Sequence, residues 1–123
     1  MKKKVLIIDD EESLLHVLKL NLEATGSYEV RTESKALRAI QVAQRFMPDI
    51  IFLDIVMPEM DGSEVANLMK EDKKIKHIPV VFLTATVTAE EVNRAGQMIG
   101  GQLFIAKPVN TKQLTECIEK VLN

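Results

Sequence analysis

The sequence has few of the residues that mark several common protein classes. Among 123 residues it has 1 Cys, no Trp, 5 Gly and 4 Pro. A lone cysteine, Cys117, excludes an intramolecular disulfide and a cysteine-rich metal site, and it favours a reducing compartment. Low Gly and Pro content with 46% hydrophobic residues excludes fibrous and disordered chains. The length predicts one domain over residues 1–123.

A strong charge imbalance and a long hydrophobic run are also missing. The 16 basic and 18 acidic residues give a net charge of −2, which offers no basic surface to nucleic acid or anionic lipid. Lys2 to Lys4 and four apolar residues open the chain, but the acidic run at 9–12 follows at once, unlike a signal peptide. No apolar run is long enough to span a bilayer. We therefore expect a soluble cytoplasmic protein that binds neither nucleic acid nor membrane.

Four short apolar runs predict the strands of a parallel sheet. Each is rich in β-branched or aromatic side chains and is too short for a helix. Because continuous apolarity means that both faces of a strand are covered, such runs are typical of parallel strands between two layers of helices. A fifth segment, 28–32, alternates between apolar and polar residues, which predicts an edge strand. The four runs are 5–8, 50–53, 80–83 and 103–106.

Amphipathic segments between and after the strands predict helices on both faces of the sheet. With right-handed crossovers, they give a flavodoxin-like (βα)5 fold of strand order 2-1-3-4-5. Its ligand site is expected beyond the carboxyl ends of the strands, between strands one and three. The apolar stripes are Leu14, Leu15, Leu18 and Leu22 before Gly26; Leu37, Ile40 and Ala43; Val65, Leu68 and Met69; Val92, Ala95 and Ile99; and Leu114, Cys117, Ile118, Val121 and Leu122.

A polar or ionisable residue follows each of the four apolar runs. These residues are Asp9 with Asp10, Asp54, Thr84 and Lys107. Neighbouring parallel strands lie ~4.8 Å apart, so these side chains should converge on one edge of the sheet. Two carboxylates at ~5 Å repel by about 3 kcal/mol at an effective dielectric constant of ~20, so the cluster requires a cation. An open set of oxygen ligands suits Mg²⁺ with a phosphate, and an aspartate can attack phosphorus to form an acyl phosphate.

These motifs, taken together and in order, resemble the receiver domain of bacterial two-component response regulators over all 123 residues. The matching pieces are Asp9-Asp10, residues 53–62, Thr84-Ala85 and Lys107-Pro108. The resemblance implies a phosphoprotein, not an enzyme with substrate turnover. It would catalyse only its own phosphorylation and dephosphorylation in a phosphorelay.

The resemblance also implies a role for each site residue. Asp54 would accept the phosphoryl group from a histidine kinase or a histidine phosphotransfer protein. Mg²⁺ would be bound by Asp10, Asp54 and the backbone carbonyl of Val56, with Asp9 acting through water. Lys107 would pair with the phosphoryl group, and its bond to Pro108 is allowed to be cis.

A conformational switch is implied as well. The Thr84 hydroxyl would move toward a phosphoryl oxygen, and the Phe104 ring would turn into the space it leaves. The surface of the fourth helix, fifth strand and fifth helix would change and dock a downstream effector or a second copy in a homodimer. By the same resemblance, Val56 and Thr86 would occupy positions that tune the phosphorylated lifetime, and an apolar Val56 could not position a hydrolytic water.

Other interpretations stay open at this point. A phosphatase of the haloacid dehalogenase type also uses Asp, Thr, Lys and Mg²⁺, but it needs a second Asp where Val56 stands. A flavin- or nucleotide-binding module lacks support, because no Gly-rich loop follows the first strand and Tyr28 is the only Tyr. The chain could also be a receiver excised from a hybrid kinase or a longer regulator. His16, His77 and Cys117 are interpreted as structural.

Overall fold

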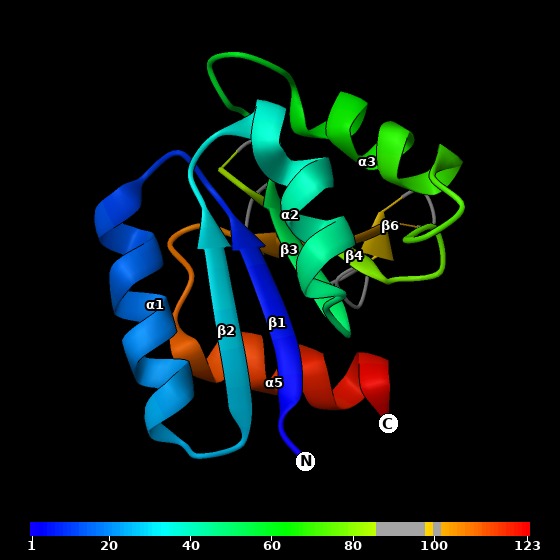
Figure 1. Ribbon diagram of the computed structural model, residues 1–123. Coiled ribbons are helices and arrows are strands. Elements are labelled where there is room, and N and C mark those ends of the chain that lie inside the picture. The colour runs from blue at the N-terminus through cyan, green and yellow to red at the C-terminus, as the bar shows by residue number, and fades with distance from the viewer. Residues whose placement is uncertain (86–97, 100–101) are drawn as a thin grey trace.

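Five parallel strands form the centre of the computed structural model, which describes residues 1–85, 98–99 and 102–123 (Figure 1). Their spatial order is β2-β1-β3-β4-β6, which confirms the predicted order 2-1-3-4-5 with β6 as the fifth parallel strand. The five strands are β1 (Lys3–Ile8), β2 (Tyr28–Glu33), β3 (Ile50–Asp54), β4 (Val80–Thr84) and β6 (Gln102–Ala106).

The sheet has one strand more than the sequence predicts. The two-residue strand β5 (Met98–Ile99) pairs antiparallel with β6 and extends the sheet beyond it. Ile99, which the helical spacing assigned to the fourth helix, therefore lies in a strand. The other residues of that expected helix, Val92 and Ala95, lie outside the described residues, as does Thr86.

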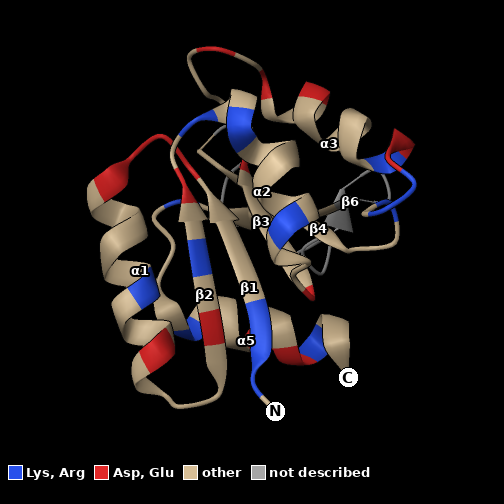
Figure 2. Cartoon of the chain, in the orientation of Figure 1, with Lys and Arg blue, Asp and Glu red and all other residues tan. Residues whose placement is uncertain are grey.

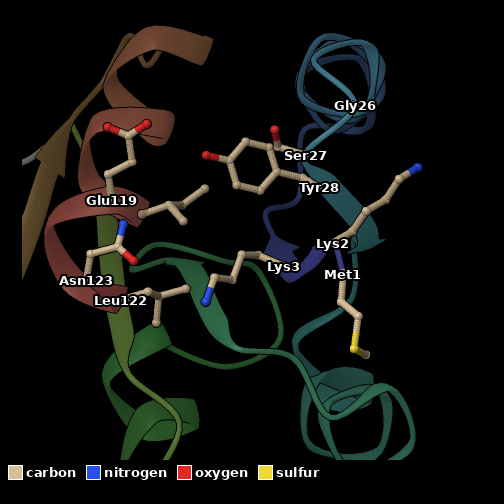
Figure 3. Close-up of a pocket in the computed structure, with 10 residues that line it drawn as sticks. Met1, Lys2, Lys3, Gly26, Ser27, Tyr28, Glu119, Leu122 and Asn123 are labelled. Carbon is tan, nitrogen blue, oxygen red and sulfur yellow. The ribbon is translucent and has the colours of Figure 1, made fainter.

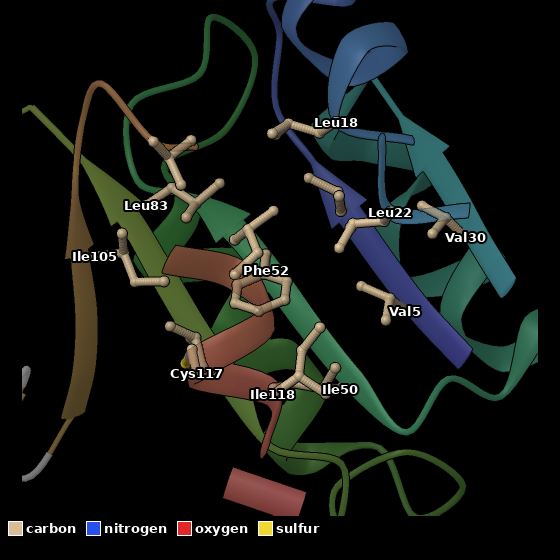
Figure 4. Packing of buried hydrophobic residues seen from close by; sticks show 14 of the residues in the cluster. Val5, Leu18, Leu22, Val30, Ile50, Phe52, Leu83, Ile105, Cys117 and Ile118 are labelled. Carbon is tan, nitrogen blue, oxygen red and sulfur yellow. The ribbon is translucent and has the colours of Figure 1, made fainter. Parts of the chain in front are cut away.

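Helices cover both faces of the sheet, as predicted. α1 (Glu12–Ala24) and α5 (Thr111–Leu122) pack against one face, where Phe52 of β3 lies at the centre of the core (Figure 4). The 3₁₀ helix η1 (Ala36–Arg38), α2 (Ala39–Phe46) and α3 (Gly62–Glu71) lie on the opposite face. Because side chains of β1 and β3 are buried on both faces, these strands read as continuous apolar runs in the sequence.

Two residues of the predicted apolar stripes point to solvent. Leu37 is 65% exposed because it lies in η1, whose three-residue turn changes the angular phase before α2 begins. α2 instead buries Ala39, Ala43 and Phe46. Leu68 is 45% exposed because the buried face of α3 is centred on other positions, chiefly Val65, Ala66 and Met69.

The edge position of β2 follows from its alternating pattern. Tyr28 and Val30 are buried, whereas Glu29 and Arg31 between and after them are exposed. β2 pairs with β1 alone among the described strands. In the turn before β2, Gly26 has a φ of 82°, a conformation that favours glycine at the end of a helix. None of the described helices is both long and apolar enough to cross a membrane.

Candidate functional site

Three aspartates meet at the carboxyl edge of the sheet. Asp9 and Asp10 directly follow β1, and Asp54 ends the neighbouring strand β3. One carboxylate oxygen from each of the three lies within 4.8 Å of the others. Asp9 and Asp54 are buried, at 0% and 4% exposure, whereas Asp10 is open to solvent. Figure 2 shows the acidic segment that leaves β1 at this edge. The convergence predicted from the strand ends is therefore confirmed.

Lys107 brings a positive charge into this cluster from the end of β6. Its Nζ lies 2.8 Å from Asp9 Oδ2, 3.3 Å from Glu11 Oε1 and 3.5 Å from Asp54 Oδ2. The contact with Asp9 is a close ion pair rather than an aligned hydrogen bond, so the buried Oδ2 accepts no hydrogen bond of good geometry. The single positive charge of Lys107 thus lies among three carboxylates, and it can neutralise only one negative charge.

The donor set fits a hard divalent cation. All three clustered ligand atoms are carboxylate oxygens, and Asp9 Oδ2 is buried without a hydrogen bond. Buried carboxylates without enough positive charge are unfavourable, and Mg²⁺ prefers oxygen ligands from one or two carboxylates with open positions for water or phosphate. Asp9, Asp10 and Asp54 are therefore the residues that could hold the ion.

Burial and repulsion change the proton affinity of these groups. Burial, with the nearby Asp9 charge as the next cause, raises the pKa of Asp54 from 3.8 to about 6, although Lys107 acts in the opposite direction. Burial also raises the pKa of Asp9, against the lowering effect of its contacts with Lys107 and the Glu11 amide. For Lys107, burial lowers the pKa, but the carboxylates of Asp9, Asp54 and Glu11 outweigh it and raise the pKa overall.

The loop after β3 holds Asp54 in place through backbone contacts. The Val56 amide donates to Asp54 Oδ1 at 3.3 Å, and the Gly62 amide donates to the Ile55 carbonyl at 2.6 Å. Gly62 begins α3 against the backbone of Asp54 and Ile55; a Cβ there would lie 2.6 Å from Ile55 Cα and closer still to the Asp54 carbonyl oxygen. Only glycine fits this position, so Gly62 lets α3 begin directly against the strand end that carries Asp54.

Thr84 and Lys107 share the same edge of the sheet. Thr84 ends β4, is 1% exposed, and its carbonyl accepts a hydrogen bond from the Lys107 amide at 2.9 Å. The peptide bond between Lys107 and Pro108 is cis. Phe104 lies further back on β6, partly buried, with its ring centroid 5.4 Å from that of Phe82. The structure thus brings Thr84 and Lys107 to one edge and packs Phe104 on the strand pair behind them.

Sequence reasoning missed Glu11. Its side chain contacts Lys107, and its amide donates to Asp9 Oδ1 at 2.9 Å. Glu11 is the N-cap residue of α1, and its side chain makes no capping hydrogen bond. The available signal was its position directly after Asp9-Asp10. Within an acidic run, however, the sequence cannot say which carboxylate turns toward the lysine.

The acidic cluster opens into a small pocket of 220 Å³. Its lining residues are Asp10, Glu11, Asp54, Val56, Ala85 and Lys107. A larger pocket of 470 Å³ lies near the amino ends of β1 and β2, with Tyr28 and Glu119 in its lining (Figure 3). The two pockets share no lining residue. The volume of a pocket therefore does not identify the functional site here. The site is identified by the carboxylates and the lysine that line the smaller pocket.

The fold and the site together define a small α/β domain with an acidic, lysine-bridged pocket at the point where strand order reverses. Comparison with known proteins supports this assignment. The family model described as "Response regulator receiver domain" matches residues 5–119, so the chain belongs to the response regulator receiver family of two-component systems.

Individual relatives match over nearly their whole length. The polar-differentiation response regulator DivK of Brucella ovis is 34% identical over 122 residues, covering 99% of this chain and 98% of the relative. The chemotaxis protein CheY4 of Vibrio cholerae superposes with a TM-score of 0.81 at 28% identity, covering 98% and 99% of the two chains. A receiver domain from Methanoculleus marisnigri is 36% identical, with a TM-score of 0.70 and coverage of 97% and 95%.

Proposed function

We propose that residues 1–123 form a receiver domain that acts as a phosphoacceptor switch, in which Asp54 accepts a phosphoryl group from a histidine kinase or a histidine phosphotransfer protein. The observation that carries the proposal is the position of Asp54. Its carboxylate lines the open pocket, 3.5 Å from the Lys107 ammonium and beside Asp9 and Asp10. Membership of the receiver family supports the same assignment. The cytoplasmic location expected from the sequence stays a prediction.

The proposed reaction transfers a phosphoryl group from a histidine nitrogen of the donor to an oxygen of Asp54. A carboxylate oxygen of Asp54 forms a bond to phosphorus while the bond between phosphorus and the donor imidazole nitrogen breaks, and the electron pair stays on that nitrogen. The transferred group brings about −1.5 to −2 charge into the pocket. Among the described residues, Lys107 carries the positive charge that lies close enough to pair with this group, since its Nζ is near Asp54 Oδ2. The Val56 amide donates to Asp54 Oδ1 and keeps the carboxylate oriented. These residues thereby orient the acceptor and stabilise the transferred charge.

Mg²⁺ is the proposed cofactor, held by Asp10 and Asp54, the backbone carbonyl of Val56, and Asp9 through water. When bound, it would neutralise the carboxylates and stabilise charge on the phosphoryl oxygens. Asp9 and Asp54 are both buried and share the ammonium of Lys107, which supports a requirement for this extra positive charge.

The proposed output is a change of surface. Thr84 ends β4 at the edge of the sheet that carries the pocket, and Phe104 packs against Phe82 on the neighbouring strand. A shift of Thr84 toward the phosphoryl group would let the Phe104 ring turn inward and alter the face formed by the fourth helix, β6 and α5. That face would dock an effector or a second copy of the chain. Val56, 63% exposed at the pocket, and Thr86 are proposed to tune the lifetime.

Phosphorylation with a small donor tests the proposal. The protein is incubated with acetyl phosphate and Mg²⁺, and mass spectrometry locates the added group. We expect one phosphoryl group on Asp54, none without Mg²⁺, and none on Asp54→Asn. Modification at another residue would contradict the site, whereas sustained turnover of a phosphomonoester that is lost in Asp54→Asn would favour a phosphatase.

A further inference from the structure

Glu11 differs from the other two carboxylates around Lys107. Asp9 and Asp54 have side chains that are 0% and 6% exposed, whereas the Glu11 side chain is 59% exposed at the pocket mouth. Asp9 and Asp54 belong to the three-carboxylate cluster that could hold a cation, together with Asp10, and Glu11 does not. The Lys107 ammonium therefore lies between inner carboxylates suited to a metal and one outer carboxylate.

A divalent cation and the ammonium would draw on the same carboxylates. Nζ of Lys107 lies 2.8 Å from Asp9 Oδ2 and 3.5 Å from Asp54 Oδ2, and both residues belong to the cluster that could hold a cation. A divalent cation bound to these carboxylates would lie close to the Lys107 ammonium, and the two positive charges would repel each other strongly because the site is partly shielded from water. The backbone of Lys107 is fixed by its hydrogen bond to the Thr84 carbonyl, so a side-chain movement must relieve the repulsion.

We propose that Glu11 is a positioning residue that receives the Lys107 ammonium when Mg²⁺ occupies the aspartate cluster, and so keeps the ammonium beside the pocket. The proposal rests on the proposed function, because that function supplies the ion. Glu11 Oε1 is already 3.3 Å from Nζ, so only a short movement is needed.

The local structure of Glu11 suits this role. Its backbone is fixed, since its amide donates to Asp9 Oδ1 and its carbonyl accepts from the Leu15 amide in the first turn of α1. Its side chain makes no capping bond, which leaves the carboxylate to the lysine. The neighbouring Glu12 has the same chemistry but accepts a hydrogen bond from Ser34 Oγ at 3.2 Å. Glu12 is therefore a matched control.

The direction of the effect follows from how many partners the ammonium has. Without metal, Asp9 and Asp54 already surround it, so Glu11 adds little. With Mg²⁺ bound, Glu11 becomes its main carboxylate. Removing the Glu11 charge therefore weakens Mg²⁺ binding, by about two- to five-fold, the range that an exposed ion pair supplies.

The test measures Mg²⁺ affinity of the unphosphorylated protein by NMR titration of backbone amides. Glu11→Gln should raise the Kd about two- to five-fold, and Glu12→Gln should leave it unchanged. In a Lys107→Met background, Glu11→Gln should have no further effect, because the two residues act as a pair. An equal effect in both backgrounds would mean that Glu11 acts directly on the metal and would overturn the proposal, as would an unchanged Kd in Glu11→Gln.

A second readout follows the ammonium itself. The Lys107 side-chain NH₃⁺ signal, assigned by its loss in Lys107→Arg, should persist at saturating Mg²⁺ in the wild type and broaden through solvent exchange in Glu11→Gln. This measurement decides the question if the Lys107→Met variants do not fold. An identical signal in Glu11→Gln overturns the inference even if Asp54 is phosphorylated normally. A wild type that neither binds Mg²⁺ nor accepts phosphate at Asp54 overturns the proposed function as well.

Discussion

Replacing Asp54 by Asn should make the metal-free protein more stable at neutral pH. The pKa of Asp54 is about 6 in the fold, against 3.8 ordinarily. Between these values the folded state holds a proton that the unfolded state has lost, so folding stability falls as pH rises. Above pH 6 the full penalty applies. A pKa difference of about 2 corresponds to about 3 kcal/mol, the upper limit of the gain from Asp54→Asn, which keeps the shape and removes the charge.

The assay is urea unfolding followed by circular dichroism in EDTA at pH 4 and pH 7.5. The gain in Asp54→Asn should approach 3 kcal/mol at pH 7.5 and fall to about 0.5 kcal/mol at pH 4, where folded Asp54 is protonated and the unfolded residue is partly protonated. Glu59→Gln, at an exposed acidic residue of the next loop, is the control and should change nothing. Mg²⁺ at 100 times its Kd should stabilise the wild type by about 2.7 kcal/mol and narrow the difference. A gain of equal size at both pH values would refute the reasoning, because the Asp54 charge could not be its source.

Three further predictions concern neighbouring groups. Lys107→Met leaves the buried Asp9 carboxylate, 0% exposed, without its cation. In urea unfolding with EDTA, the free energy of unfolding should therefore fall by about 3 kcal/mol. Replacing EDTA by Mg²⁺ should partly restore it. Gly62→Ala should cost more than about 2 kcal/mol and slow phosphorylation, whereas Gly26→Ala, with φ 82° and open space around it, should cost about 1 kcal/mol and leave phosphorylation unchanged. Cys117 is buried and its pKa is raised to about 11, so Ellman's reagent at pH 8 should label it only after unfolding; rapid labelling of the native protein would contradict its burial.

The strands and the central site could be predicted because both follow from where parallel strands end. Runs such as 50–53 are apolar on both faces only when helices cover both, and the residue that follows each run must lie at the carboxyl edge. Asp9, Asp54 and Lys107 are therefore brought together by strand order alone. Their backbone positions require no knowledge of side-chain conformation.

The predictions from the sequence were wrong or incomplete where local backbone geometry decides which way a side chain points. Leu37 has helical spacing with Ile40 but lies in a 3₁₀ turn, so its side chain points to solvent. Glu11 and Glu12 are adjacent and chemically identical, yet they turn to different partners, Lys107 and Ser34. Consecutive positions on a helix point about 100° apart, so one residue of offset at the start of α1 decides which carboxylate reaches the site.

The same crowding that destabilises this site also makes it responsive. Asp9 and Asp54 are buried with one ammonium between them, so any added cation or change of charge there shifts the balance of contacts around Lys107. Since Lys107 is anchored by its amide to the carbonyl of Thr84, a change in its side-chain partners acts next to the residue proposed to carry the signal toward β6. The electrostatic penalty at the aspartates and the proposed switch at Thr84 are therefore connected through one lysine.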